Sequence, residues 1–520
     1  MTVTESPETP TRVRGKASTH VEVLPDDAHN RALVEFVHPG GRQNPEPTGR
    51  YNLVVVGGGT AGLVSAAGAA GLGARVALVE RHLMGGDCLN YGCVPSKAVL
   101  RVAHAAHAAR EAEAFGIATG AVRADFGRAM ERMRRLRTGI AHHDSVKRFT
   151  DLGVDVFLGD ARFVGPDVLE VDARRLTFSR AIVATGARAA APPIPGLEDA
   201  GYLTNETVFS LTDLPPRLAV IGAGPIGCEM AQAFARLGSA VTVVSRGPRI
   251  LPREDADASA VVEAQLRREG ISLRLGGRVI AVQATAGGRA VVFDGGAGEE
   301  RIEVDEILVA VGRAPNVEGL GLEAAGVDAD QTGVLVDDRL RTSNRRIYAA
   351  GDICSKYQFT HAADAMARVA IQNALFFGRR TASSLVIPWC TYTDPELAHV
   401  GIGSDEARAM GDRAVTILVP LADVDRAVLE GDDHGYAEAH IEASSGRILG
   451  VTIVARHAGD LIGPFVLAMT AGLRADQLSR TVLPYPTVGE VARKIGDQWA
   501  RRRLTPMLRR VFERFLAWRR

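Results

Sequence analysis

Cysteine is scarce in this chain, and what is missing narrows the function more than the overall composition does. Five cysteines among 520 residues are too few for a secreted protein held together by disulfides. The first twenty residues are polar and lack the apolar core of a signal peptide, and no run of eighteen apolar residues occurs. We therefore expect a cytoplasmic protein without a transmembrane segment.

A net charge is missing as well. Lys and Arg together number 61, as do Asp and Glu, so no global bias indicates nucleic acid as a partner. The length allows about three domains of ordinary size. Residues 1–50 are rich in Pro, Thr, Glu and Gly and have little apolar periodicity. They predict a flexible extension, mostly disordered or draped over the surface.

Two glycine-rich turns follow short apolar runs that are typical of strands. In the first, residues 51–56 lead into Gly57, Gly59 and Gly62, then into an alanine-rich helix and a second strand that ends at Glu80. Glycines at such a turn let a pyrophosphate approach the helix N-terminus, and the acid accepts hydrogen bonds from a ribose. This combination predicts a dinucleotide site.

The second turn selects a different nucleotide. Counted from its first glycine, the position equivalent to Glu80 is Ser245, followed by Arg246 and Arg249. A carboxylate there would favour the free 2′-hydroxyl of NAD, whereas a hydroxyl and two cations suit a 2′-phosphate. We therefore predict NADPH rather than NADH; the alternative is that both arginines point to solvent. The glycines of this turn are Gly222, Gly224 and Gly227.

Two cysteines, Cys88 and Cys93, stand within the stretch from Gly85 to Lys97. Pro95 can begin a helix at its first position, so the pair is placed to form a small-loop disulfide with one thiolate at a helix N-terminus. A structural disulfide or a zinc half-site is the alternative, but it needs partners that the chain does not offer, and we predict no metal ligands. The stretch resembles the redox-active disulfide of the FAD-dependent pyridine nucleotide-disulfide reductases.

The resemblance implies an α/β fold with two doubly wound nucleotide-binding domains and a C-terminal α+β dimerisation domain. Relatives are homodimers in which this last domain completes the partner's active site. The implied divisions are 51–190 with 314–387 for FAD, 191–313 for NAD(P), 388–492 for dimerisation, and 493–520 as a basic tail.

The resemblance also implies roles for single residues. Reducing equivalents would pass from NADPH through FAD to the disulfide, with Cys93 as the thiol nearer the flavin and Cys88 as the thiol that meets the substrate. Lys97 and Glu229 would form an ion pair near the flavin, the alternative being an ordinary surface pair. Asp352 would bind the ribityl chain rather than merely cap a helix. Further implied cofactor contacts are Gly86, Lys97, Thr185, Gly186, Gly312, Arg313 and Gly351.

One position departs from the family pattern. In the disulfide reductases a His-Pro-Thr, with a glutamate three residues after the threonine, supplies the catalytic acid-base; here Glu490 matches that glutamate, but Tyr485 stands in place of the histidine. A phenol with a pKa of about 10 is a poor proton donor and acceptor at neutral pH compared with an imidazole near 6.5. The tyrosine resembles mercuric reductase, although mercuric reductases end in a cysteine pair and this chain has no cysteine after Cys390.

Three functions follow from these features. The leading one is a mercuric reductase-like enzyme that reduces a metal ion or another small-molecule acceptor. The first alternative is a dihydrolipoamide dehydrogenase-like disulfide reductase. From another class comes a membrane-associated flavin redox sensor or adaptor.

The C-terminal tail is strongly basic. After Glu490 the chain carries ten Lys or Arg residues and two acidic residues. Thr505 and Pro506 signal a helix start, and apolar residues follow at helical spacing. A basic amphipathic helix of this kind can lie on the inner face of an anionic membrane, or it can dock on the protein's own dimer.

Overall fold

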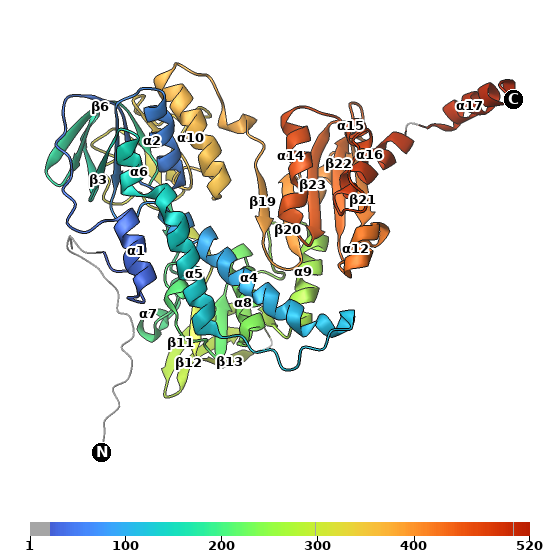
Figure 1. The fold of residues 1–520 in the computed structure, drawn as a ribbon, viewed down its shortest axis with the longest axis horizontal. Helices are drawn as coiled ribbons and strands as arrows, with labels where there is room; N and C mark the ends of the chain where they lie inside the picture. Colours follow the sequence, from blue (N-terminus) through green and yellow to red (C-terminus); the bar gives the residue numbers. More distant parts are fainter. Residues whose placement is uncertain (1–20, 297, 503) are drawn as a thin grey trace.

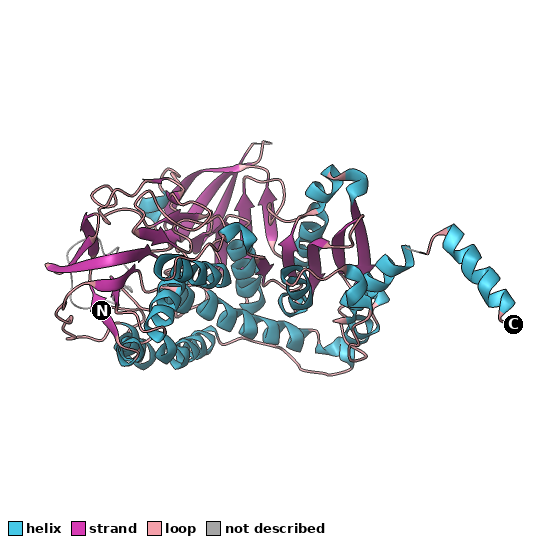
Figure 2. Cartoon of the chain, turned by 90° about the horizontal axis from the view of Figure 1, so that it is seen from above, coloured by secondary structure: helices cyan, strands magenta, loops and turns pink. Residues whose placement is uncertain are grey.

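The computed structural model describes residues 21–296, 298–502 and 504–520. Its main body is built on two largely parallel sheets, a three-stranded antiparallel sheet and a five-stranded antiparallel sheet (Figure 1). The predicted α/β fold, with two doubly wound domains and an α+β C-terminal domain, is confirmed. Seen from above, most helices lie along one side of the strands, and the last helix projects away from the body (Figure 2).

The first sheet is completed by two distant parts of the chain. Its parallel part runs in the order β3, β2, β1 and β6, and β18 pairs with the other edge of β6. Helices α2 and α10 pack against each other over this sheet (Figure 1). Because helices cover the parallel part of the sheet, its central strand β1 is almost continuously apolar and buried. The bounds are β1 Tyr51–Val56, α2 Thr60–Gly71, β2 Val76–Glu80, β3 Val154–Leu158, β4 Ala161–Gly165, β5 Val168–Val171, β6 Arg174–Val183, β18 Ile347–Ala349 and α10 Thr360–Leu375.

The second domain repeats this plan on a smaller scale. Four parallel strands run in the order β10, β9, β8 and β14, and a three-stranded antiparallel sheet lies beside them. The bounds are β8 Arg217–Ile221, α8 Pro225–Leu237, β9 Ala240–Ser245, α9 Ala256–Arg268, β10 Ser272–Leu275, β11 Arg278–Thr285, β12 Gly288–Asp294, β13 Glu299–Val304 and β14 Glu306–Val309.

The third domain is a five-stranded antiparallel sheet in the order β19, β20, β23, β22 and β21. Helix α14 packs on it, and α9 of the second domain contacts β20 and β23. Arg236 of α8 also joins these domains, with ion pairs of 2.7 Å to Glu269 and 2.9 Å to Asp394. The bounds are β19 Pro388–Thr391, β20 Glu396–Gly401, α11 Ser404–Ala409, β21 Ala414–Pro420, β22 Tyr436–Glu442, β23 Ile448–Ala455, α13 Ala458–Leu461, α14 Gly463–Thr470, α15 Ala475–Ser479 and α16 Glu490–Arg502.

The N-terminal extension is more structured than its composition predicts. Residues 1–20 lie outside the described residues, but Ala28–Val37 form helix α1. Leu33 is fully buried, and Asn30 accepts a 2.6 Å hydrogen bond from Arg137 of helix α5, which spans Phe126–Ala141. The prediction of a mostly disordered arm therefore does not hold for this helix. Its partners lie 107 residues away, so local composition could not reveal them.

The basic tail divides into two parts. Helix α16 belongs to the third domain, where Ile495 and Trp499 are buried in the core. Helix α17, Pro506–Trp518, has no buried residue and projects from the body (Figure 1). The predicted start signal is present, because the Thr505 hydroxyl accepts a hydrogen bond from the Leu508 amide. Among the described residues, no helix combines the length and apolar character needed to cross a bilayer.

Candidate active site

The glycines of the two predicted nucleotide turns have matching packing. A Cβ on Gly57 would lie 2.4 Å from the carbonyl oxygen of Ala184, and one on Gly222 would lie 2.4 Å from that of Ala310. Likewise, a Cβ on Gly62 would lie 1.8 Å from the Gly57 oxygen. Any side chain would therefore push the helix away from the strand, and the open turn at the helix N-terminus would be lost.

One continuous cavity of about 2300 Å³ connects the two turns. Both cysteines face it, as do residues from all three domains. The predicted site residues that line it are Gly57, Gly59, Glu80, Gly86, Cys88, Cys93, Lys97, Thr185, Gly186, Gly222, Gly224, Glu229, Ser245, Arg246, Gly312, Arg313, Gly351 and Asp352. Gly62 and Gly227 lie behind the turns and close the helix–strand packing.

The cysteine pair lies at the start of helix α4, which spans Cys93–Arg110. Cys93 is the first helical residue, so the helix begins two residues before Pro95, which the sequence placed at the first position. Both thiols are free, and a hydrogen bond joins them. The hydroxyl of Thr360, at the N-terminus of α10, lies 3.5 Å from the Cys93 sulfur.

This arrangement shifts the pKa values of the two thiols in opposite directions. The hydrogen bond from Cys88, then that from Thr360 and the charge of Lys97, lower the pKa of Cys93 to about 6 against the effect of burial. The hydrogen bond to Cys93 and burial raise the pKa of Cys88. At neutral pH Cys93 is therefore the thiolate and Cys88 the thiol that donates to it.

An ion pair whose carboxylate is buried joins three domains beside the cysteines. Lys97 Nζ lies 2.8 Å from Glu229 Oε2, and the other carboxylate oxygen accepts a 3.0 Å hydrogen bond from the Tyr392 amide. Glu229 is 5% exposed, and the Lys97 ammonium lies 4.4 Å from the centre of the Tyr392 ring. Burial, the largest effect, lowers the pKa of Lys97. The charge of Glu229, the hydrogen bond to it and the charges of Cys93 and Cys390 raise this pKa, and they outweigh burial. The structure therefore brings the predicted pair together, with Glu229 buried and Lys97 partly exposed.

The region between the cysteines and Asp352 is organised by Arg313. Its guanidinium lies 3.2 Å from Asp87 and 3.4 Å from Asp352. Asn205 donates a 2.8 Å hydrogen bond to Asp87. Burial raises the pKa of Asp352, and Arg313 opposes this change. The two acids and the arginine thus form a charged wall of the cavity.

The acid of the first turn, Glu80, is held by backbone amides. Glu80 ends β2 and accepts hydrogen bonds from the amides of Gly58, at 2.6 Å, and His82, at 2.7 Å. Burial raises its pKa, and both amides oppose this effect. Its carboxylate is therefore fixed at the rim of the turn, where the cavity opens.

The second turn has cations where the first has this acid. Ser245 ends β9, and its hydroxyl accepts a 3.3 Å hydrogen bond from the Gly247 amide. Arg246 lines the cavity, whereas Arg249 turns away and donates to the Pro252 carbonyl. Arg278, at the start of β11, also lines the cavity. The sequence missed Arg278 because no motif surrounds it.

Tyr485 and Glu490 do not reach this cavity in the same chain. The Tyr485 side chain is 70% exposed, and its hydroxyl donates a 2.8 Å hydrogen bond to Asp425. Glu490 is buried and pairs with Arg493 at 2.9 Å. Glu490 is the first residue of α16, and Tyr485 lies five residues before it in the third domain.

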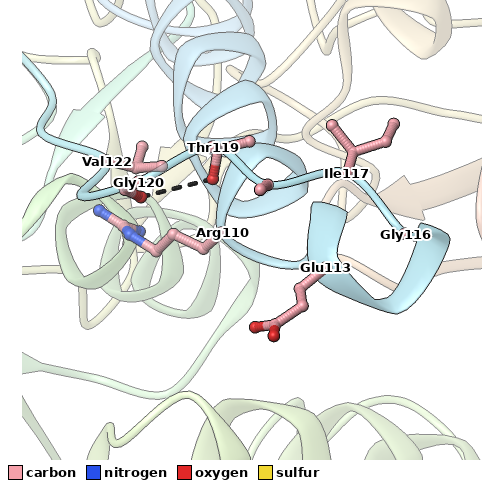
Figure 3. A pocket seen from close by; sticks show the side chains of 8 residues that line it. Arg110, Glu113, Gly116, Ile117, Thr119, Gly120 and Val122 are labelled. Atoms are coloured by element: carbon pink, nitrogen blue, oxygen red, sulfur yellow. Dashed lines mark hydrogen bonds between the residues drawn. The ribbon is translucent and has the colours of Figure 1, made fainter.

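A second, smaller pocket of about 550 Å³ lies in the turn that follows α4 (Figure 3). Arg110, Glu113 and Thr119 line it, but Arg110 is already committed to the Arg236 carbonyl at 2.6 Å. The pocket has no cysteine and no nucleotide-binding turn. It therefore offers no redox chemistry.

Comparison with known proteins agrees with this geometry. The family model described as pyridine nucleotide-disulphide oxidoreductase matches residues 51–367, and that of the family's dimerisation domain matches residues 387–495. The chain is 35% identical over 475 residues to a mercuric reductase of Bacillus cereus, covering 91% of this chain and 75% of the relative. It is 30% identical over 470 residues to a dihydrolipoyl dehydrogenase of Bacillus subtilis, covering 85% and 96%.

Among solved structures, the chain is similar to the Cu(II) complex of RclA, an HOCl-induced flavoprotein disulfide reductase of Escherichia coli. The TM-score is 0.77 and the identity 27%, with 87% of this chain and 100% of that chain covered.

Proposed function

Because the chain belongs to the pyridine nucleotide-disulphide oxidoreductase family, whose members use FAD and a pyridine nucleotide, we propose that it takes electrons from NADPH and delivers them through Cys93 and Cys88 to a metal ion or another non-thiol acceptor. The observation that carries this proposal is the thiolate–thiol pair at the N-terminus of α4, stabilised by Thr360 and Lys97.

The first glycine turn and the segment around Asp352 fit FAD. Gly57 and Gly62 leave the backbone open to a pyrophosphate, Glu80 is placed for the adenosine ribose, and Asp352 for the ribityl chain. FAD, when bound, would accept hydride and reduce the disulfide. Lys97 and Glu229 would set the charge beside it, and Cys93 would be the sulfur held next to it as a thiolate.

The nucleotide preference rests on the far end of the cavity. Ser245, Arg246 and Arg278 supply a hydroxyl and two cations in place of the carboxylate that would repel a 2′-phosphate. NADPH is therefore the proposed reductant. The ratio of kcat/KM for NADPH and NADH tests this choice, and a preference for NADH would overturn it.

The family's dimerisation domain supports a homodimer. Tyr485 is exposed and distant from its own cavity, so it would complete the site of the partner protomer together with Glu490. A phenol supports proton transfer to a leaving thiolate poorly, and this favours an acceptor that needs none. Reduction of Hg(II) is such a reaction: NADPH and Hg(II) give NADP⁺, elemental mercury and one proton.

The decisive experiment compares two acceptors. NADPH oxidation by the purified FAD-loaded dimer is followed with Hg(II) in excess small thiol and, separately, with lipoamide. We expect Hg(II)-dependent turnover that the Cys88→Ser/Cys93→Ser double variant abolishes. Faster reduction of lipoamide would favour the dihydrolipoyl dehydrogenase-like alternative, to which the 30% identity with the Bacillus subtilis enzyme gives support. A flavin reduced without turnover on either acceptor would favour the redox sensor or adaptor.

The tail suggests where the enzyme works. Helix α17 exposes Met507, Val511 and Phe515 together with its arginines, so an apolar stripe and basic groups share one unburied helix. We place the protein in the cytoplasm with α17 in weak contact with an anionic membrane surface. Flotation with phosphatidylglycerol-containing liposomes should capture the full chain but not residues 1–503, which keep α16 intact. Equal flotation of both, or of neither, would contradict this placement.

A further inference from the structure

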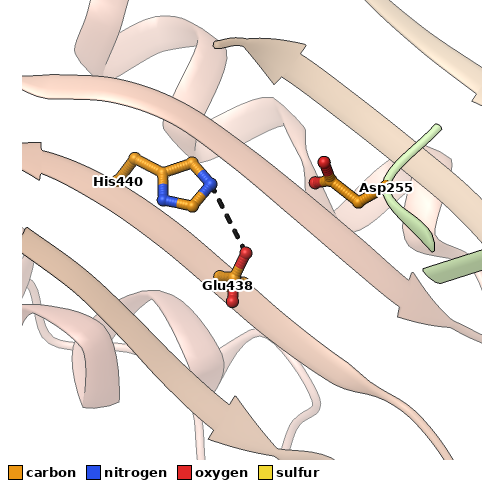
Figure 4. A group of neighbouring side chains, drawn as sticks. All are labelled: Asp255, Glu438 and His440. Carbon is orange, nitrogen blue, oxygen red and sulfur yellow. Dashed lines mark ion pairs between the residues drawn. The ribbon is translucent and has the colours of Figure 1, made fainter. Parts of the chain in front are cut away.

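Away from the cavity, three side chains with metal-binding groups meet where the second domain packs on the third (Figure 4). Asp255 directly precedes α9 of the second domain. Glu438 and His440 are two residues apart on β22, so their side chains lie on the same face of that sheet. One ligand atom from each residue lies within 4.8 Å of the other two.

The imidazole of His440 is the most informative part of this cluster. Its side chain is 1% exposed, and Nδ1 lies 3.0 Å from the Thr416 hydroxyl. The buried Nε2 has no hydrogen-bond partner, yet it lies 3.4 Å from a Glu438 oxygen (Figure 4). When Nδ1–H donates to Thr416, the Nε2 lone pair faces the Glu438 carboxylate, and a cation between them would satisfy both; in the other tautomer the Thr416 hydroxyl donates to Nδ1 and Nε2–H faces the carboxylate.

The two carboxylates are oriented but not neutralised by their hydrogen bonds. Asp255 accepts from the Ser404 amide at 2.9 Å and from the Thr452 hydroxyl at 3.2 Å. Glu438 accepts from the Ser404 hydroxyl at 2.7 Å. All of these donors are uncharged. Arg408, whose charge acts on the cluster, forms its ion pair with Asp405 instead.

We propose that Asp255, Glu438 and His440 bind one divalent transition-metal ion of the zinc class, with water in the remaining positions. One imidazole nitrogen with two carboxylates suits zinc, manganese or iron(II), whereas calcium and magnesium prefer oxygen ligands alone. The second domain supplies one ligand and the third domain two, so the ion joins the domains. This site is separate from the redox cysteines and does not depend on the acceptor proposed above.

Calorimetric titration with ZnCl₂ tests the proposal. The protein is the FAD-loaded full chain carrying Cys88→Ser/Cys93→Ser, because the active thiols would otherwise compete for zinc. We expect saturable binding of one equivalent per protomer. His440→Gln and Glu438→Gln should each weaken it at least tenfold. His434→Gln is the matched control, since this exposed histidine also lies beside an acid, 3.6 Å from Asp433, but outside the cluster.

A ligand from the other domain makes the test independent of β22. Asp255→Asn keeps the size of the side chain and should also weaken zinc binding at least tenfold, and retained FAD absorbance reports correct folding. If His440→Gln does not retain FAD, Asp255→Asn decides the question. The proposal is overturned if no one-equivalent binding occurs, if Asp255→Asn binds zinc as tightly as its parent, or if His434→Gln weakens binding equally.

Discussion

Replacing Lys97 should change the acidity of Cys93 by a measurable amount. Lys97 is one of the groups that lower the pKa of this thiol to about 6. At an effective dielectric constant of about 20, two unit charges interact by about 4 kcal/mol at about 4 Å and by less at larger separations, and about 1.4 kcal/mol equals one pKa unit. The Lys97 side chain is 35% exposed and Glu229 opposes its effect, so the expected change is smaller than this limit. We expect Lys97→Gln to raise the pKa of Cys93 by about one unit.

The rate of alkylation of the reduced enzyme by iodoacetamide, read at Cys93 by peptide mass spectrometry, measures this pKa. Only the thiolate reacts, so the rate rises with pH and is half-maximal at the pKa. The wild-type midpoint should lie near pH 6 and that of Lys97→Gln about one unit higher. Lys356→Gln is the control, because this exposed lysine lines the same cavity over the Tyr357 ring. An unchanged midpoint in Lys97→Gln, or an equal change in the control, would refute the reasoning.

Three further changes test other parts of the site. Gly62→Ala should lower the free energy of unfolding by more than about 3 kcal/mol and abolish FAD retention, because its Cβ would meet the Gly57 oxygen. Gly71→Ala, with open space around it, should be neutral or slightly stabilising; urea denaturation measures both changes. Removing Arg246 or Arg278 should raise the KM for NADPH about tenfold or more and leave that for NADH nearly unchanged; equal effects on both would contradict a 2′-phosphate contact. Tyr485→His should raise the ratio of lipoamide to Hg(II) turnover at least about tenfold, and a constant ratio would exclude a proton-transfer role.

The parts of the site that could be predicted are those whose function depends on the local chain. The glycines are required because the strand, the turn and the helix are adjacent in sequence, and Gly57 and Gly62 pack as such a turn demands. The cysteines likewise owe their environment to the helix that begins at Cys93. In both cases the contacts that matter are made within a short segment, so the sequence pattern was sufficient to predict them.

Residues brought in from distant segments could not be found in this way. Thr360 lies 267 positions from Cys93, and its hydroxyl has no motif that marks it as a thiolate partner. Helix α1 was missed for the same reason, since it depends on a distant arginine, Arg137. The cluster of Asp255, Glu438 and His440 was missed because its residues belong to different domains, and none looks unusual in its own segment.

The reactivity of Cys93 also depends on how the three domains are assembled. Lys97 belongs to the first domain, Glu229 to α8 of the second, and the amide that fixes Glu229 belongs to Tyr392 at the start of the third. Two turns further along α8, Arg236 is held between its own domain and Asp394 of the third. Because breaking a buried ion pair leaves an uncompensated charge, a shift of α8 would be opposed at both places. The same contacts that dock the domains therefore hold two of the charges that act on the thiol, Lys97 and Glu229, so a change at the domain interface would alter thiol chemistry without touching either cysteine.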